Sequence, residues 1–361
     1  MIRSTALVPF FKSMAVLFVF FSLPASAADS SAQKPRELVL LNWSEYIDPE
    51  LVVKFEKQFN AKLTEVYFES DDLRDHMMLE TDGKAYDLAL VNGISVDVYR
   101  KRGWLSSVSG TQIPNLKYID ERWLDAFPGL EGYAVPYFWG TMGIAYRKDL
   151  VPTPLSSWMD ILQPAEYLHG RIGMIENSRD ALGMALKALG YSANSTDTAQ
   201  IKAAEQLLVA QQPHVKTYTY IALNEESALV SGDIIATMLY SGDALMVQEH
   251  HKEIAYVVPS EGGNIWVDYL VVLESSKNKA LAWAFLNFLN EPENAAQLAE
   301  FVYYATPNKG AEKLLPAEFL EDPVIYPSQA VLSRSEFYKP LPPRVSKKRN
   351  IAFSRALQSM D

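Results

Sequence analysis

Aromatic residues stand next to carboxylates at several points of this chain. The first such segment is Trp43-Ser44-Glu45-Tyr46, which follows the apolar run Leu38–Leu41. Two aromatic rings beside a carboxylate can bind an organic cation, through cation–π attraction together with charge pairing. The same Trp and Tyr could instead close a hydrophobic core at the end of a strand. This segment alone leaves both interpretations open.

Three more segments combine the same residue types: Tyr240-Ser241-Gly242-Asp243, Trp266-Val267-Asp268 and Tyr303-Tyr304. Trp266 and Asp268 are two residues apart on a predicted strand, so their side chains face the same side. An indole and a carboxylate on one face can hold an ammonium group. Each segment alone also fits core packing or solvated surface, but together they indicate one ligand chemistry, that of an organic amine.

Enzyme signatures are absent from the sequence. It has no phosphate-binding glycine loop, no dinucleotide-binding glycine motif and no H-E-x-x-H zinc motif. The adjacent His250 and His251 would point apart on a helix, so we expect no metal site there. We therefore predict no catalytic residue, no metal and no cofactor. A secreted hydrolase using Asp243 and Asp268 remains an alternative, although nothing in the sequence raises the pKa of either acid.

Residues 1–27 have the composition of a secretory signal peptide. Arg3 and Lys12 provide the positive charge that precedes the apolar run Met14–Leu23. Ala25-Ser26-Ala27 provides small residues for cleavage after Ala27. The sequence has no cysteine, which excludes disulfides and a lipid-anchored cysteine. We therefore expect an exported protein that resides in the periplasm.

The net charge of −11 disfavours binding to nucleic acid and to anionic membranes, and it attracts polycations. Acidic residues that serve solubility alone would explain this charge equally well. From charge and composition we expect no nucleic-acid partner.

Strand and helix patterns alternate along the chain, which predicts α/β layers with helices flanking the sheets. The predicted strands are 38–41, 63–68, 87–91, 133–137, 143–146, 171–175, 234–240, 254–258 and 266–273. The predicted helices are 50–59, 73–81, 96–101, 180–189, 198–211, 225–231 and 279–289. No Gly/Ser-rich linker separates the two halves, which favours two lobes joined by several short crossings.

The chain resembles the spermidine/putrescine-binding branch of the periplasmic extracellular solute-binding proteins. The segments that carry the resemblance are Asn42–Tyr46, Ala85–Leu88, Val135–Gly140, Leu182–Leu186, Glu261–Gly263, Trp266–Asp268 and Tyr304–Asn308. The resemblance implies a type II two-lobed periplasmic-binding-protein fold, with a mixed sheet and flanking helices in each lobe and the ligand cleft between the lobes. It places lobe 1 at residues 36–142 plus 267–312, and lobe 2 at residues 143–266 plus 313–361.

The resemblance also assigns ligand contacts. Trp43 and Tyr46 would sandwich an aliphatic chain, while Trp266 and Tyr304 would wall the cleft and Asp268 would pair with an ammonium group. The full implied set of ligand-binding residues is Trp43, Ser44, Glu45, Tyr46, Asn92, Asn177, Asp180, Tyr240, Asp243, Trp266, Asp268, Tyr304 and Arg355. Asn177 stands where spermidine binders carry an acid, and Ile94 stands where the family carries an aromatic ring.

These features predict a monomeric, non-enzymatic protein that binds a norspermidine- or spermidine-like polyamine. By resemblance, it would present the ligand to an inner-membrane permease of the ATP-binding-cassette type. The alternative partner is a membrane receptor that controls cyclic di-GMP signalling and biofilm formation.

Overall fold

One long strand, β4 (Ala134–Arg147), runs through both halves of the folded chain. All fourteen of its residues are buried, which accounts for a sequence that is apolar except at Thr141 and Arg147. Two separate strands, 133–137 and 143–146, were predicted for this segment, and that prediction is wrong because residues 138–142 continue the same strand. Trp139 and Gly140 continue the antiparallel ladder with β9 (Asn264–Val272), and Gly140 lies opposite Trp266.

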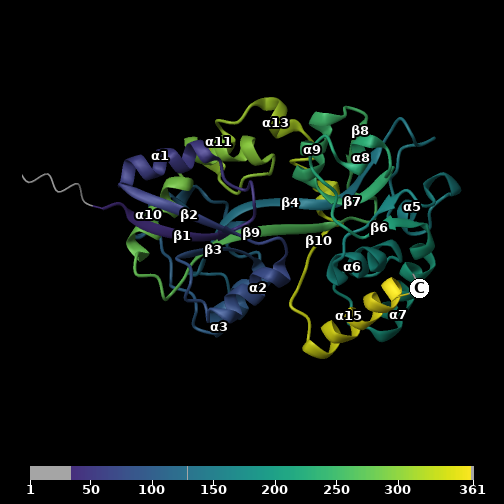
Figure 1. Ribbon diagram of the computed structural model, residues 1–361, viewed down its shortest axis with the longest axis horizontal. Coiled ribbons are helices and arrows are strands. Elements are labelled where there is room, and N and C mark those ends of the chain that lie inside the picture. Colours follow the sequence, from purple (N-terminus) through teal and green to yellow (C-terminus); the bar gives the residue numbers. More distant parts are fainter. Residues whose placement is uncertain (1–33, 128, 359–361) are drawn as a thin grey trace, which may run out of the picture. The chain divides into compact units, whose positions relative to one another are not determined.

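The computed structural model describes residues 34–127 and 129–358. The predicted signal peptide, residues 1–27, lies outside the described residues. Within residues 35–361, the strands pair in the order β2-β1-β3-β9-β4-β7-β5-β6, while β10 adds to β9 and β8 adds to β4. The first part of β4 pairs with β9, and the part from Met142 onward pairs with β7 and β8. β4 therefore joins two mixed sheets (Figure 1).

The first lobe contains parallel strands followed by helices, as the alternating pattern predicted. Its elements are β1 (Arg36–Asn42), α1 (Pro49–Phe59), β2 (Ala61–Tyr67), α2 (Asp71–Glu80), β3 (Leu88–Asn92), α3 (Gly93–Lys101), η1 (Pro114–Tyr118), α4 (Glu121–Leu124), α10 (Lys279–Leu289), α11 (Pro292–Val302), α12 (Lys309–Glu312) and α13 (Ala317–Glu321). β1 is parallel to both β2 and β3, whereas β9 is antiparallel to β3 and β4.

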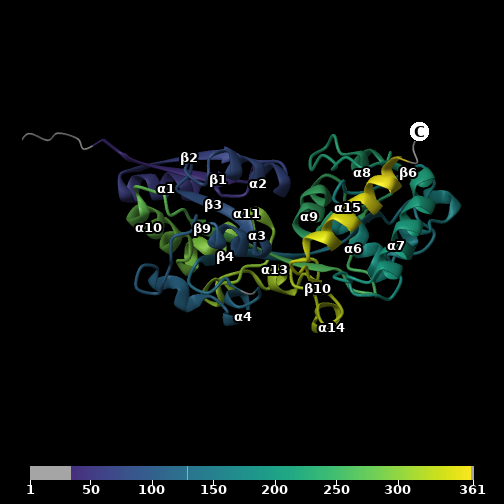
Figure 2. The same cartoon turned by 90° about the horizontal axis from the view of Figure 1, so that it is seen from below.

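The second lobe is built on the far half of β4. Its elements are α5 (Met159–Leu162), η2 (Glu166–Leu168), β5 (Ile172–Gly173), α6 (Ser178–Ala188), α7 (Thr198–Gln211), η3 (Gln212–His214), β6 (Val215–Thr217), α8 (Ala228–Ser231), β7, α9 (Ser241–His250), β8, α14 (Gln329–Leu332), β10 (Glu336–Phe337) and α15 (Pro343–Gln358). The strand β7 covers Ala236–Tyr240, and β8 covers Ile254–Val257. The C-terminal helix α15 lies on the outside of this lobe against α6 and α7 (Figure 2).

Separate hydrophobic cores hold the two lobes. The first core surrounds β1, β3 and β9 and includes Phe55, whose ring contacts the rings of Phe285 and Phe288. The second core lies between β5, β7 and helices α6, α7 and α15, with Trp158 fully buried. A third, smaller cluster lies under α9. Because β4 contributes to all of them, the lobes share a backbone connection but not a common core.

None of the helices in the described residues is long and apolar enough to cross a membrane.

A tight turn before β9 depends on a glycine. Gly262 has φ of +85°, and a Cβ there would lie 2.1 Å from the carbonyl oxygen of Arg334. Its carbonyl accepts a hydrogen bond of 2.8 Å from the indole of Trp158. The turn thus connects the start of β9 to the second core and to the segment before β10.

We predict that Gly262→Ala destabilises the protein by about 2 kcal/mol or more, because the new Cβ meets backbone atoms and the left-handed conformation is strained. Urea unfolding followed by tryptophan fluorescence measures the change. Gly110→Ala is the matched control, since its Cβ would meet no heavy atom within 4 Å. Equal stabilities of the two variants would contradict this account of the turn.

Candidate ligand-binding site

Three aspartates occupy the first turns of three helices that begin beyond strand ends. Asp71 lies in α2, Asp180 in α6 and Asp243 in α9. Amide groups and the helix dipole make a helix N-terminus favourable for negative charge. An empty helix N-terminus would attract an anion. With an aspartate in the first turn, each helix instead presents a carboxylate.

A fourth carboxylate comes from strand β9. Asp268 lies opposite Asn92, the last residue of β3, in the antiparallel ladder. The hydroxyl of Tyr46 donates a hydrogen bond of 3.2 Å to Oδ2 of Asp268. Burial raises the pKa of Asp268 to about 7, and the negative charge of Asp71 adds to the shift, whereas Arg74 opposes it. This carboxylate is therefore held in surroundings that disfavour its charge.

Asp180 lies in similar surroundings in the second lobe. It is 4% exposed, and the hydroxyl of Tyr240 donates to it at 3.4 Å. Burial raises the pKa of Asp180 to about 6, against the opposing effect of Arg179, and Asp71 raises it further. The electrostatic influence of Asp71 on both Asp180 and Asp268 indicates that the two lobes contribute acids to one region.

Asp243 accepts hydrogen bonds from two tyrosines. Tyr304 donates at 2.6 Å, and Tyr220 donates from the other side. Burial raises the pKa of Asp243, while both tyrosine hydroxyls act in the opposite direction. Tyr304 packs in the first core, whereas Asp243 belongs to α9, so this hydrogen bond connects the lobes. The adjacent Tyr303 makes a second such connection to Glu249.

Aromatic rings run between these carboxylates as a continuous series. Tyr46 contacts Tyr304 edge-on with centroids 5.9 Å apart. Tyr304 contacts Trp266 at 4.8 Å, and Trp266 contacts Tyr240 at 6.1 Å, both nearly perpendicular. We call these four rings, together with Asp180, Asp243 and Asp268, the aspartate–aromatic cluster. The sequence analysis had named all seven residues, and the structure brings them together.

Two glycines permit this close packing of rings. A Cβ at Gly242 would lie 2.5 Å from the ring of Tyr304, and one at Gly140 would lie 2.6 Å from the ring of Trp266. Any larger residue at either position would displace the ring above it. The glycine in Tyr240-Ser241-Gly242-Asp243 therefore has a packing role that the sequence analysis did not assign.

Trp43, Ser44 and Glu45 lie beside the cluster rather than within it. The Trp43 ring packs against Phe68, with centroids 4.4 Å apart. Ser44 and Glu45 are exposed, and Glu45 has a positive φ of 56°. Within the described residues, neither of them forms a hydrogen bond to the cluster.

Asn92 and Asn177 cap helices. Oδ1 of Asn92 accepts from the amides of Ile94 and Ser95, at 3.1 and 3.0 Å, and its Nδ2 donates to Asp71 at 2.7 Å. Oδ1 of Asn177 accepts from the amides of Arg179 and Asp180, at 2.9 and 3.2 Å. Each asparagine therefore fixes a helix N-terminus and the position of an aspartate.

Arg355 is the predicted site residue that lies elsewhere. It belongs to α15, and its guanidinium forms an ion pair of 3.3 Å with Glu205 of α7. No carboxylate of the cluster is among its partners in the described residues. The structure therefore places Arg355 apart from the other predicted ligand-binding residues, against α7.

The sequence analysis missed Asp71, Arg74 and Tyr220. Arg74 is buried and donates to Asp71 at 2.5 Å, to Asp75 at 2.9 Å and to Ser95 at 2.8 Å. The Ser70-Asp71-Asp72 sequence is a typical helix start, since Ser70 caps α2 and accepts from the amide of Leu73. That signal could have identified Asp71, whereas nothing local indicates that Tyr220 reaches Asp243.

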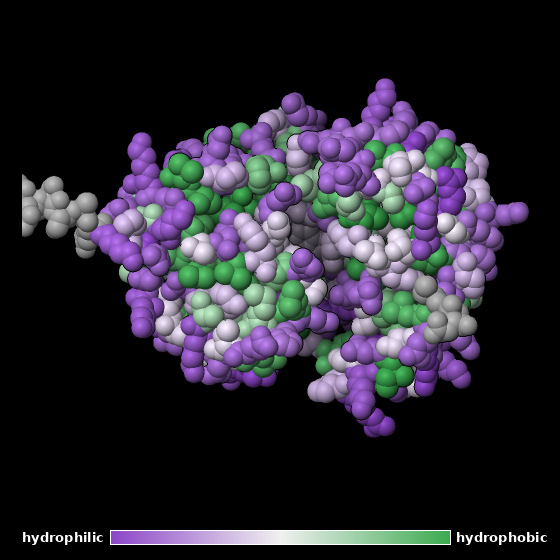
Figure 3. Space-filling view, in the orientation of Figure 1, coloured by the Kyte–Doolittle hydropathy of each residue, from purple (hydrophilic) through white to green (hydrophobic). Residues whose placement is uncertain are grey.

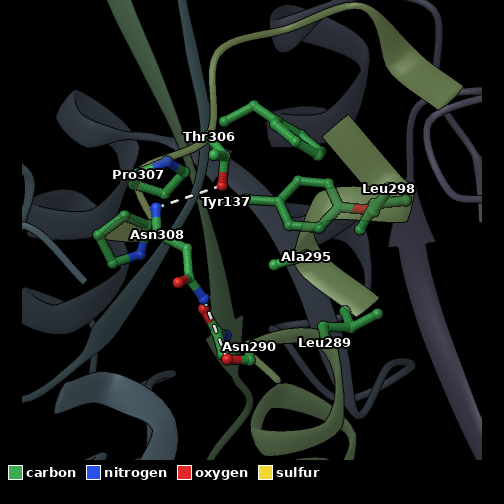
Figure 4. A pocket seen from close by; sticks show the side chains of 10 residues that line it. Tyr137, Leu289, Asn290, Ala295, Leu298, Thr306, Pro307 and Asn308 are labelled. Carbon is green, nitrogen blue, oxygen red and sulfur yellow. Dashed lines mark hydrogen bonds between the residues drawn. The ribbon is translucent and has the colours of Figure 1, made fainter. Parts of the chain in front are cut away.

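The hollow between the lobes is visible at the surface (Figure 3). A small pocket of about 10 Å³ lies in the first lobe, lined by Tyr137, Asn290, Thr306 and Asn308 among others (Figure 4). Its volume corresponds to about one water molecule. Asn308 donates to the carbonyl of Asn290 at 3.0 Å there, and the amide of Trp139 donates to the carbonyl of Ala305. This pocket is too small for a polyamine ligand.

Within residues 34–127 and 129–358, no three histidine or carboxylate side chains are grouped so that they could hold a metal ion.

The sequence matches the family described as bacterial extracellular solute-binding protein over residues 50–326, and the chain belongs to this family. Relatives with polyamine ligands in their names are similar over most of its length. The chain is 31% identical to the spermidine/putrescine-binding periplasmic protein of Salmonella typhimurium, covering 88% of this chain and 90% of that protein. It is 32% identical to the norspermidine sensor of Vibrio cholerae, covering 80% of each.

Solved structures agree in fold. The substrate-binding protein of a spermidine/putrescine ABC transporter from Streptococcus pneumoniae superposes with a TM-score of 0.79 at 30% identity, covering 90% of this chain and all of that one. A transporter protein from Listeria monocytogenes, described as a spermidine/putrescine ABC transporter, gives the same TM-score at 33% identity, covering 89% and 99%. The two-lobed fold predicted from the sequence is confirmed.

The raised pKa of Asp268 predicts a pH-dependent stability of the ligand-free protein. Its folded pKa of about 7 exceeds the usual value of about 4, so the folded state binds more protons between these pH values. Stability should therefore fall as pH rises from about 4 to 7. We expect Asp268→Asn to reduce this decrease, measured as the difference between melting temperatures at low and neutral pH.

The exposed Asp233 provides the control for this experiment, because Asp233→Asn removes one carboxylate outside the cluster. If Asp268→Asn and the native chain lose the same stability over this pH range, burial of Asp268 is not the cause.

Proposed function

We propose that this chain is a periplasmic polyamine-binding protein that closes over a linear amine and presents it to a membrane partner. The observation that carries the proposal is the aspartate–aromatic cluster, in which burial raises the pKa of three carboxylates. In the described residues, no lysine or arginine nitrogen lies within ion-pair distance of Asp180, Asp243 or Asp268. A ligand that brings its own positive charges would complete this site.

The chemistry of a polyamine fits the alternation of rings and acids. Its ammonium groups can pair with carboxylates, which offsets the cost of burying both charges. Its methylene segments can lie along the rings, which also attract the flanking cations. An uncharged chain of equal length would leave the carboxylates unpaired. The cluster should therefore select for charge and for spacing together.

We assign roles within the cluster as follows. Asp180, Asp243 and Asp268 pair with ammonium groups, and Tyr46, Tyr240, Trp266 and Tyr304 form the walls. Trp43, Ser44 and Glu45 would contact one end of the ligand, next to Phe68. Asn92 and Asn177 act on the ligand indirectly, because they hold the helix starts that carry Asp71 and Asp180.

We further propose that the lobes are the moving bodies. The sequence predicted lobe 1 at residues 36–142 plus 267–312, and lobe 2 at residues 143–266 plus 313–361. We propose one change to these lobe boundaries. Leu315, Phe319 and Ile325 pack in the first core, so we assign residues 313–326 to lobe 1. The hydrogen bond from Tyr304 to Asp243 already joins the lobes in this structure, and closure around a ligand would convert ligand occupancy into a shape that a partner can recognise.

The names of the relatives support this function and its periplasmic location. They also leave two classes of partner, since one relative is named a sensor and others are named binding proteins of the transport type. We propose an import permease as the partner, with a membrane sensor as the second candidate. Loss of labelled polyamine uptake after deletion of the gene supports the permease, whereas unchanged uptake with an altered response to polyamine supports the sensor. We propose no enzymatic activity.

The principal ammonium partner is predicted to be Asp268. Leaving an ammonium group unpaired in a closed site costs about 3–5 kcal/mol, so Asp268→Asn should weaken spermidine binding by about two orders of magnitude or more. Isothermal titration calorimetry measures this loss, and circular dichroism verifies the fold. Asp233→Asn should bind like the native chain. Native-like affinity of Asp268→Asn would remove Asp268 from the site.

Ligand length is predicted from the number of acids. Asp180, Asp243 and Asp268, with Glu45 near one end, exceed what a diamine can neutralise. We therefore expect norspermidine or spermidine to outcompete putrescine and cadaverine. The measurement is a competition series at physiological ionic strength, because weak binding of polycations to an acidic surface is screened by salt. Preference for putrescine over every triamine would show that only two acids take part.

A further inference from the structure

A groove on the outside of the second lobe carries charge of the opposite sign to the rest of the protein. It runs between α7 and α15, has a volume of about 790 Å³ and contains none of the cluster residues. Figure 1 and Figure 2 both show these two helices side by side. The lining residues are Thr198, Ile201, Lys202, Glu205, Gln206, Val209, Ala210, Arg344, Lys347, Lys348, Ile351 and Arg355.

Five of these residues are basic and one is acidic, in a chain of net charge −11. Helix α15 has no acidic residue at all. Glu205 is already paired with Arg355, and Lys348 donates to the hydroxyl of Thr198. Among the described residues, no carboxylate lies within ion-pair distance of Lys202, Arg344 or Lys347. The groove therefore retains an uncompensated positive charge.

Apolar side chains lie between these cations. Ile351 is 42% exposed and Val209 is 37% exposed, while Ile201 is buried beneath them. Two packed helices leave a groove against which a third helix can pack its apolar face. The cations along the edges of the groove would then face acidic residues on either side of that apolar face.

Other occupants fit less well. A flat lipid surface would not fill the groove between the two helices. A small anion would need donors that surround it, yet Lys202, Arg344, Lys347 and Arg355 are all exposed. The groove combines length, exposed apolar side chains and dispersed positive charge, which together match an acidic amphipathic helix.

We propose that the α7/α15 groove docks an acidic amphipathic helix of the membrane partner. The location of this partner rests on the proposed function, whereas the chemistry of the docking helix follows from the groove itself. Arg355, which does not contact the cluster, then serves in the groove by holding Glu205 and leaving the other cations available.

The test uses the mature chain and a fluorescent 16-residue peptide with glutamates flanking a leucine stripe. A second peptide carries glutamine in place of every glutamate. Fluorescence anisotropy at physiological ionic strength should show binding of the acidic peptide at least about tenfold tighter than binding of the neutral one. The triple variant Lys202→Glu, Arg344→Glu, Lys347→Glu should lose at least about tenfold in affinity, and Ile351→Ser should also weaken binding.

A triple reversal at exposed lysines outside the groove is the control: Lys57→Glu, Lys277→Glu, Lys313→Glu. It changes the net charge by the same amount and should alter affinity by less than about twofold. If the two triple variants lose the same affinity for the acidic peptide, the change in net charge alone explains the effect and the proposal is overturned. Failure of the native chain to bind the acidic peptide, or its preference for phosphatidylglycerol vesicles, would overturn it as well.

Calorimetry with spermidine separates this proposal from the proposed function. We expect the groove triple variant to bind spermidine like the native chain, yet to fail to restore polyamine uptake or response in cells that lack the gene. If the native chain does not bind spermidine but still binds the acidic peptide, the proposed function fails and the groove assignment stands. Full restoration in cells by the groove variant would contradict the docking role.

Discussion

The constraint on which this structure depends is the burial of several carboxylates without enough cations of its own. The first turns of α2, α6 and α9 carry Asp71, Asp180 and Asp243, where helix dipoles lower the cost of negative charge. Among these three aspartates, Asp71 alone has an arginine within ion-pair distance in the part of the chain that the structure describes, namely Arg74. Arg179 and Arg74 lower the pKa values of Asp180 and Asp268 from beyond ion-pair distance. Tyrosine hydroxyls donate hydrogen bonds to Asp180, Asp243 and Asp268 but carry no positive charge. We propose that a bound organic cation completes this arrangement.

The two-lobed architecture makes such an arrangement possible. β4 and β9 carry the chain between lobes, so acids from separate cores can approach one another without sharing a core. Gly140 and Gly242 leave room for the rings of Trp266 and Tyr304 to pack onto the backbone of the opposite elements. The same rings keep water from the carboxylates, and this exclusion raises their pKa values.

Sequence patterns predicted most of the elements, because apolar periodicity is a local signal. The helix 279–289 was predicted with the bounds that the structure has, and the cluster residues were all named. Long-range relations were not accessible in this way. Asn92 and Asn177 turned out to cap helices, Arg355 lies on another face, and β4 continues through Trp139-Gly140. No local pattern indicated that burial would raise the pKa of Asp268. The burial of this carboxylate depends on residues far away in the sequence, such as Tyr46, which is 222 residues distant.

The raised pKa values bear on function in a specific way. Two acids with pKa values above their usual range are also typical of hydrolases, so the pKa values alone do not distinguish binding from catalysis. The distinction comes from what surrounds them. Tyr46 donates to Asp268 and Tyr240 donates to Asp180, and a series of packed rings lies between them, to which we assign the walls of the ligand site. Under the proposed function, such a site would pair ammonium groups with these carboxylates. Ligand charge would then be the condition for stable closure, which is the property a binding protein needs if its partner is to recognise only the loaded form.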